Sequence, residues 1–164
     1  MVTDSNTWTK NCVECAISKA GPEVRAPLQS IQCTYPFEIV GLDYLSLGRP
    51  ADTYPYILVF TDLFSRYTVA VPTRDQTTHT MVKALWGAFI QTFGFPERIL
   101  SDRGGAFESE LMQQLCALYG CVKSRTTPYH PQGNGAVERF NQTLLSLLSS
   151  LNAEEQSQWH LSLH

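Results

Sequence analysis

Residues 56–72, YILVFTDLFSRYTVAVP, decide the fold class. Two runs of aliphatic, aromatic and β-branched residues flank the polar pair Ser65 and Arg66, a pattern typical of two strands joined by a tight turn. A third such run, FEIVGLDYLSL at 37–47, lies upstream and is separated from the other two by turn-forming residues. The sequence therefore predicts three consecutive antiparallel strands before any helix.

Helices and strands alternate in the rest of the chain. The apolar residues between Thr78 and Phe93 recur at helical spacing, which predicts a helix that ends at Phe93. Thr77 or Thr78 can cap its N-terminus. Four more elements follow: a strand at 97–101, a helix at 107–119, a strand at 121–125 and a helix at 135–151, with a further helix starting near 154. This order predicts an α/β domain with a mixed five-stranded sheet flanked by helices.

Composition excludes several classes of protein. The chain has 164 residues, 43% of them hydrophobic, which is enough for one globular core and argues against disorder. Its longest apolar run, residues 57–60, is far shorter than the roughly 20 residues of a membrane span. The N-terminus has no signal-peptide pattern, so we expect an intracellular protein that does not contact a membrane. The formal net charge of −3 argues against a nonspecific polycationic nucleic-acid binder.

Two regions of different character divide the chain. Residues 1–36 hold three prolines and no sustained periodicity, which indicates a linker or the tail of an upstream module. We expect the folded domain at 37–164, cut short at its C-terminal end because the last helix stops unfinished at His164.

Three carboxylates occupy positions suited to chemistry. Asp43 lies inside the first strand, Asp102 follows the end of the fourth, and Glu138 lies in the first turn of the helix at 135–151. Each has a structural alternative. Asp43 can lie on a solvated strand face, Asp102 can form a turn, and Glu138 can interact favourably with a helix N-terminus.

Taken together, the three acids predict a metal site. Strand ends and helix starts are rigid, so they can hold carboxylates close together if divalent cations neutralise the repulsion. Mg²⁺ prefers oxygen ligands and accepts substrate phosphates as part of its shell. Two such ions, roughly 4 Å apart, can activate an attacking oxygen and stabilise a leaving one in phosphoryl transfer.

The motifs around these acids resemble a known family. GLDYLS surrounds Asp43, TDLFSRY follows, ILSDRGGAFES surrounds Asp102, and TPYHPQGNGAVERFNQTL surrounds Glu138, with 35 residues between the last two acids. Together they resemble the integrase catalytic cores of gypsy-class LTR retrotransposons and retroviruses. The resemblance covers residues 37–151 and implies a ribonuclease H-like fold.

The resemblance also implies a function, DNA integration. An enzyme of this family trims the 3′ end of the element's DNA and then joins the freed hydroxyl to a target phosphodiester. It implies that Asp43, Asp102 and Glu138 hold two Mg²⁺ or Mn²⁺ ions. It further implies that the partners are double-stranded DNA and other copies of the chain, and that the protein works in the nucleus when it acts on chromatin.

Polar residues near the acids are candidates for DNA contact. By the family motif, the loop before Glu138 would present Tyr129, His130, Gln132 and Asn134 to DNA. Further candidates from the sequence are Asn141, Arg103, Lys123 and Arg125. The alternative is that these are ordinary turn residues and solvated surface charges. The polar stripe that continues from Glu138 lacks the lysines that retroviral members often carry, which weakens the expectation of strong DNA binding by the core alone.

Two other features have structural interpretations. Cys12 and Cys15 form half of a tetrahedral zinc site, but no histidine precedes them, so we expect no zinc to bind this chain. Asp62, a fourth acid, is expected to bond Arg66 or a turn amide rather than a metal.

Two other functions fit the same residues. A fragmentary or domesticated core could bind nucleic acid or protein without catalysis. A ribonuclease H-like nuclease that cleaves RNA in hybrids would use similar metal ions.

Overall fold

The computed structural model describes residues 31–47, 53–125, 135–152, 155–156, 158–161 and 163, and of residues 135 and 136 only the backbone. Its strands are β1 (Ile39–Ser46), β2 (Tyr56–Asp62), β3 (Thr68–Thr73), β4 (Arg98–Ser101) and β5 (Val122–Arg125). Its helices are α3 (Thr78–Leu85), the π-helical turn η1 (Trp86–Ile90), α4 (Gln91–Phe93), α5 (Glu110–Leu118), α6 (Gly135–Ser150) and the 3₁₀ turn η3 (Trp159–Leu161). No helix in these described segments is long and apolar enough to span a membrane.

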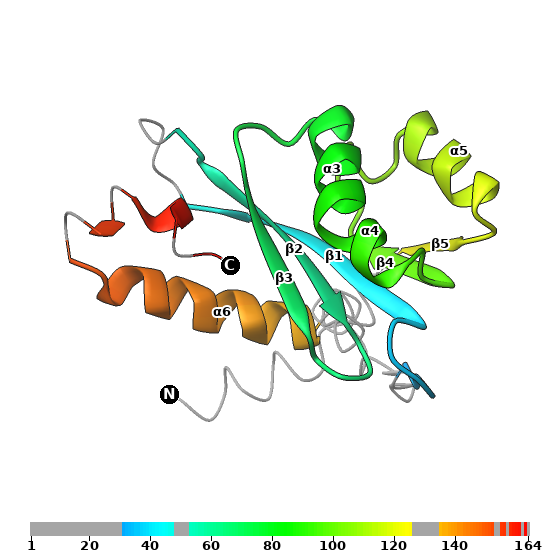
Figure 1. Ribbon diagram of the computed structural model, residues 1–164, viewed down its shortest axis with the longest axis horizontal. Coiled ribbons are helices and arrows are strands. Elements are labelled where there is room, and N and C mark those ends of the chain that lie inside the picture. The colour runs from blue at the N-terminus through cyan, green and yellow to red at the C-terminus, as the bar shows by residue number, and fades with distance from the viewer. Residues whose placement is uncertain are drawn as a thin grey trace, which may run out of the picture.

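The five strands form one mixed sheet in the order β3-β2-β1-β4-β5 (Figure 1). β1, β2 and β3 pair antiparallel, whereas β4 runs parallel to β1 and β5 runs parallel to β4. The predicted mixed sheet with three antiparallel strands at its start is therefore confirmed. Because β1 and β4 are parallel and Ser101, the last residue of β4, pairs with Leu42, the end of β4 lies beside the middle of β1.

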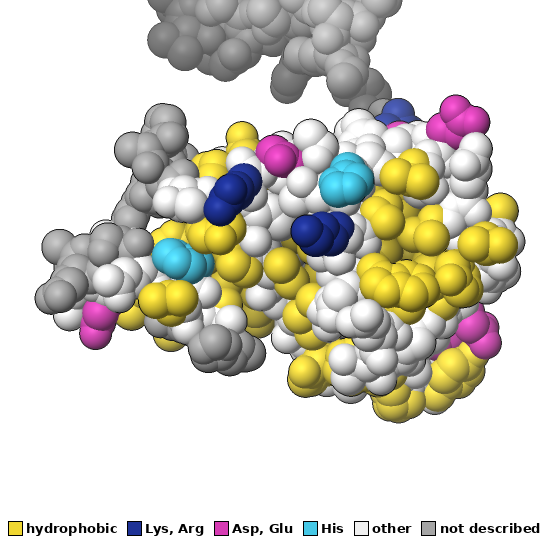
Figure 2. Space-filling model, turned by 45° about the horizontal axis from the view of Figure 1, so that its top comes forward, with side chains coloured by type: hydrophobic (Ala, Val, Ile, Leu, Met, Phe, Trp, Pro, Cys, Tyr) yellow, Lys and Arg dark blue, Asp and Glu magenta, His cyan; other side chains and the backbone are white. Residues whose placement is uncertain are grey.

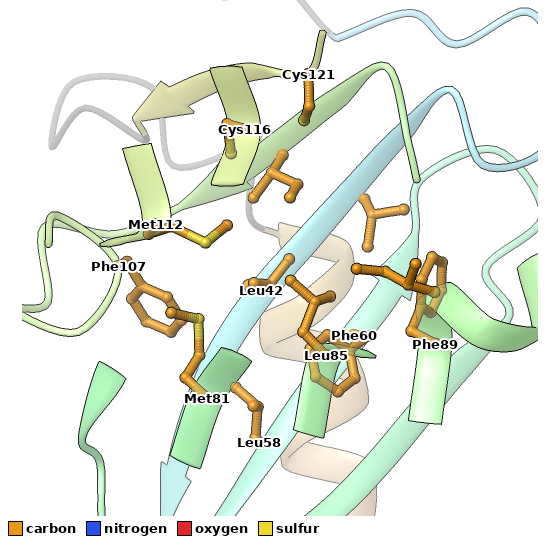
Figure 3. Close-up of a cluster of buried hydrophobic side chains, with 13 residues drawn as sticks. Leu42, Leu58, Phe60, Met81, Leu85, Phe89, Phe107, Met112, Cys116 and Cys121 are labelled. Atoms are coloured by element: carbon orange, nitrogen blue, oxygen red, sulfur yellow. The ribbon is translucent and has the colours of Figure 1, made fainter. Parts of the chain in front are cut away.

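Helices cover both faces of this sheet, since side chains alternate along each strand. Leu58 and Phe60 point to one face, where they pack with residues of α3 and α5 such as Met81 and Met112 (Figure 3). Ile57 and Val59 point to the opposite face and form a second cluster with α6 and η3. Both core clusters are thus built around the central strands.

Capping residues set the helix boundaries. The side chain of Thr77 accepts a hydrogen bond from the Thr80 amide, so the first helix starts where the sequence indicates. This helical stretch ends at Gly94, whose φ of 82° favours glycine, but the π-helical turn inside it was not expected. The helix expected at 107–119 begins only at residue 110, because Ser109 caps it by accepting from the Met112 amide.

Asp62 stabilises the turn between β2 and β3. Its carboxylate is fully buried and accepts hydrogen bonds from the amides of Phe37 (3.0 Å) and Ser65 (2.9 Å) and from the Ser65 hydroxyl (2.5 Å). Arg66 takes part through its main-chain amide, which donates to the Asp62 carbonyl. The expected structural role of Asp62 through a turn amide is confirmed.

Candidate active site

Asp43 lies within β1, and Asp102 directly follows the end of the neighbouring parallel strand β4. In the β1–β4 pair, Leu42 lies opposite Ser101. Continuing this register by one residue places Asp43 beside Asp102, and the Asp43 side chain lies on the α6 face of the sheet, where it binds Asn141. Neighbouring strands are about 4.8 Å apart, so the main chains at the two acids are close, and the Asp102 charge contributes to the raised pKa of Asp43.

A tight turn fixes Asp102. The amide of Gly104 donates to Asp102 Oδ1 over 2.9 Å. A Cβ at Gly104 would lie only 3.0 Å from that oxygen and 3.2 Å from Phe107 Cδ2, so glycine lets the loop fold back onto the carboxylate. Asp102 itself remains exposed.

Helix α6 brings Glu138 to the same place. Its first turn lies directly on β1, because a Cβ added at Gly41 would come within 2.8 Å of Val137 Cγ2. Glu138 is the next residue and is exposed in the first turn of the helix. The close contact at Gly41, two residues before Asp43, therefore sets the distance between the helix acid and the strand acid.

Asn141, one helical turn after Glu138, contacts Asp43 directly. Its Nδ2 donates to Asp43 Oδ2 over 2.7 Å, and the Tyr44 amide donates to Asp43 Oδ1 over 2.9 Å. Asn141 is 8% exposed, and its Oδ1 is buried without a hydrogen-bond partner among the described residues. The structure thus gives Asn141 a place beside Asp43, while its contact with DNA stays a prediction.

The three carboxylates influence one another electrostatically. The pKa of Asp43 is raised to about 6, chiefly by burial and also by the negative charges of Asp102 and Glu138, against the lowering effect of the two hydrogen bonds it accepts. The raised pKa of Asp43 shows that its negative charge is unfavourable beside the other two carboxylates, and a bound cation would reduce this repulsion. Asp102 and Glu138 are therefore close enough to act on Asp43.

A divalent ion suits the donors at this site. Mg²⁺ takes oxygen ligands and is usually held by only one or two carboxylates, with waters and phosphates completing its shell. Within the described segments, however, no three His, Cys, Asp or Glu side chains converge closely enough to form a metal cluster. The assignment of Asp43, Asp102 and Glu138 as ligands stays a prediction.

Two of the three candidate cations for DNA contact, Lys123 and Arg125, have protein partners. Lys123 Nζ donates to Ser101 Oγ over 2.6 Å and lies 3.5 Å from Glu108 Oε1. Arg125 pairs with the other oxygen of Glu108. Arg103 is exposed next to Asp102. Contact of these three residues with phosphates stays a prediction.

Six of the predicted residues lie outside the described residues, namely Tyr129, His130, Gln132, Asn134, Cys12 and Cys15. Sequence analysis missed Ser101 and Glu108, because their link to Lys123 depends on strand pairing between segments distant in the chain.

Comparison with known proteins identifies the family. Residues 34–131 match the family model described as integrase core domain. The chain is 33% identical over 153 residues to the Gag-Pol polyprotein of avian reticuloendotheliosis virus, covering 92% of this chain and 13% of the polyprotein. It is 40% identical over 113 residues to the Gag-Pol polyprotein of baboon endogenous virus (strain M7), covering 69% of this chain and 6% of the polyprotein. It therefore spans only a small part of these relatives.

Solved structures agree in fold. A chain of the simian T-cell lymphotropic virus intasome in complex with PP2A regulatory subunit B56 gamma matches with a TM-score of 0.69 at 24% identity, covering 98% of this chain and 59% of that one. The HTLV-2 integrase catalytic core domain in complex with magnesium (trimeric form) matches with a TM-score of 0.60 at 25% identity, covering 77% and 83%. The expected ribonuclease H-like fold is confirmed. The chain belongs to the integrase core domain family.

Proposed function

We propose that this chain is the catalytic core of a retroelement integrase that inserts the element's DNA into target DNA. The observation that carries the proposal is the placement of Asp43 within β1 and of Asp102 directly after the adjacent strand β4, with the charges of Asp102 and Glu138 near enough to raise the pKa of Asp43. Family membership supports DNA as the substrate. The magnesium in the HTLV-2 structure supports a divalent ion as cofactor.

Both expected reactions are in-line displacements at phosphorus. In the first, water cleaves a phosphodiester near the 3′ end of the element's DNA; in the second, the freed 3′ hydroxyl attacks a target phosphodiester and a target 3′ oxygen leaves. Two bound Mg²⁺ or Mn²⁺ ions would supply the charge that activates the attacking oxygen and stabilises the leaving one.

The protein residues have positioning roles in this scheme. Asp43 and Asp102 would hold an ion beside the end of β4, and Glu138 would complete the site from α6. Asn141 holds Asp43 Oδ2 through its amide and so limits rotation of that carboxylate. No protein nucleophile is required, because water and DNA supply both attacking oxygens.

Double-stranded DNA and further copies of the chain are the proposed partners, and the nucleus is the proposed place of action on chromatin. Hydrophobic side chains gather on the surface over α3 and α5, a feature suited to contact between copies (Figure 2). The exposed members of this surface, which we call the aromatic face, are Trp86, Leu111, Leu118 and Tyr119. The HTLV-2 relatives are described in dimeric and trimeric forms.

Strand transfer tests the proposal. The chain is incubated with DNA carrying an element end, with target DNA and with Mn²⁺ or Mg²⁺, and is compared with the variants Asp102→Asn and Glu110→Gln. Glu110 is exposed on α5, away from the candidate site, so its variant is the matched control. We expect joined products from the unmodified chain and from Glu110→Gln, and a loss of at least about 100-fold with Asp102→Asn.

A non-catalytic DNA-binding core is the second candidate. The observation in its favour is that the described acids form no three-residue metal cluster. Equal product from the unmodified chain and Asp102→Asn, together with retained DNA binding, would favour this candidate.

A further inference from the structure

Lys123 is a largely buried cation that the proposed reaction does not use. Its side chain is 12% exposed, and its Nζ contacts Ser101 Oγ at 2.6 Å, Glu108 Oε1 at 3.5 Å and the Ser124 carbonyl at 3.5 Å. Removing an ammonium group from water costs free energy, which these oxygen contacts offset.

A chain of hydrogen bonds leads from Lys123 to Asp102. Lys123 Nζ donates to Ser101 Oγ, and Ser101 Oγ donates over 2.9 Å to the carbonyl oxygen of Asp102. The charge of Lys123 strengthens both hydrogen bonds, because it polarises the Ser101 hydroxyl and makes it a better donor to the Asp102 carbonyl. The peptide group that follows Asp102 is thus held from one side, while the Gly104 amide holds the carboxylate itself.

Lys123 lies on the opposite face of the sheet from the candidate site. Ser101 pairs with Leu42, which belongs to the core between the sheet and helices α3 and α5. Asp43, the neighbour of Leu42, points to the other face, where it binds Asn141 of α6. The hydrogen bonds that lead from Lys123 reach Asp102 at its main-chain carbonyl.

Lys123 also binds both ends of the loop that carries Asp102. Ser101 is the last residue of β4, and Glu108 is the second residue before α5. Glu108 pairs with Lys123 and with Arg125. Residues of β5 therefore bind the loop at its start, through Ser101, and at its end, through Glu108. Between these points, the ring of Phe107 packs on Tyr44, the neighbour of Asp43, with ring centroids 5.5 Å apart.

From this geometry we propose that Lys123 is a positioning residue that holds Asp102 in place through Ser101 and Glu108. The proposal rests on the proposed function in one respect, since it takes Asp102 to be a metal ligand. It assigns to Lys123 a role different from phosphate contact.

The test compares Lys123→Met with Lys123→Arg and with Lys83→Met, the control at an exposed lysine on α3. Methionine matches the length of the lysine stem, and Glu108 keeps Arg125 as its partner, so the fold is expected to persist. The first measurement is hydrogen exchange of the Gly104 amide without metal, which reports its bond to Asp102. The second is the Kd for Mn²⁺.

We expect Lys123→Met to speed Gly104 exchange about tenfold and to weaken Mn²⁺ binding about tenfold, the lower end of the effect of removing supporting partners. Lys123→Arg should recover part of both effects, and Lys83→Met should change neither. Unchanged Gly104 exchange and Mn²⁺ affinity in Lys123→Met would overturn the proposal. So would a variant that loses only DNA affinity, because that result identifies a phosphate contact.

The two proposals fail in distinguishable ways. If the unmodified chain binds no Mn²⁺, the proposed function fails, and Gly104 exchange still decides whether Lys123 positions Asp102. If Lys123→Met does not fold, Ser101→Ala replaces it, since this change breaks the link to Asp102 and leaves the Lys123–Glu108 pair. Normal Gly104 exchange in Ser101→Ala would overturn the positioning role.

Discussion

Asp43 is a half-buried carboxylate whose proton affinity depends on its neighbours. Burial and the charges of Asp102 and Glu138 bring its pKa to about 6, above the ordinary 3.8. The folded state therefore binds this proton more tightly than the unfolded state does. The stability that Asp43 contributes is fully present below about pH 4 and is lost as the pH rises through about 6.

Asp43→Asn is expected to stabilise the metal-free chain at pH 8 and to leave its stability nearly unchanged at pH 4. The amide of Asn141 can rotate so that its oxygen, which has no hydrogen-bond partner in the described segments, accepts from the new side chain. We expect a gain on the order of 1 kcal/mol at pH 8, allowing for solvent screening. Urea unfolding at both pH values measures it, with Glu110→Gln as control; a gain independent of pH would contradict the assignment.

Metal affinity should follow the same titration. An ion must displace the proton of Asp43, so the apparent affinity for Mn²⁺ should fall about tenfold per pH unit below about pH 6 and level off above it. Titrations between pH 5 and pH 8 measure this dependence. A constant affinity over that range would show that Asp43 does not bind the ion.

At the scale of single residues, the sequence identifies the acids but not their partners. Asp43, Asp102 and Glu138 stand out by their motifs and spacing. The bond from Asn141 to Asp43 joins residues 98 positions apart, and the bond from Lys123 to Ser101 joins residues 22 apart. Such pairs follow from strand register and helix docking, which residue types alone do not specify.

At the scale of elements, the contact between β1 and α6 controls the site. Gly41→Ala would place a methyl group 2.8 Å from Val137 Cγ2, so the first turn of α6 would have to move away from β1. We expect a loss of about 1–3 kcal/mol in the free energy of unfolding.

Val137→Ala should relieve part of this loss, giving a coupling energy of about 1 kcal/mol in a double-mutant cycle measured by urea unfolding. Gly87→Ala is the control, because no atom of the described residues lies within 4 Å of a Cβ at that position. If the losses in the free energy of unfolding are purely additive, the side chains at positions 41 and 137 are not energetically coupled, which would contradict the steric contact.

Sequence patterns predict which elements form better than where each one starts. All five strands occur where hydrophobic patterns place them. The late start of α5 depends on the cap at Ser109. Phe107 lies inside the expected helix but belongs to a turn, in which its amide donates a hydrogen bond to the Gly104 carbonyl. Apolar residues in such a turn are buried as they would be in a helix, so the pattern does not separate the two.

At the scale of the whole molecule, the aromatic face is the proposed contact between copies. Leu118, 76% exposed, lies on it, and the rings of Trp86 and Tyr119 lie 6.0 Å apart. Leu118→Glu should lower the mass observed by light scattering, because a charge in an apolar interface is costly. The change should alter monomer stability by no more than about 0.5 kcal/mol.

Leu147→Glu is the matched control, since Leu147 is 60% exposed on α6, outside the aromatic face. An equal fall in mass for both variants, or for neither, would place the contact elsewhere.

The fold class of the whole molecule follows from the order of elements and from the family motifs. Strand order was not specified by the local patterns, because β4 pairs with β1 across more than 50 intervening residues. Local hydrophobic spacing contains no information about such a distant partner.

Anomalous diffraction from crystals soaked in Mn²⁺ tests the central claim most directly. The account predicts a peak between the carboxylates of Asp43 and Asp102, on the α6 face of the sheet and within reach of Glu138. A peak elsewhere, or none at saturating Mn²⁺ with Asp43 still bound to Asn141, would contradict it.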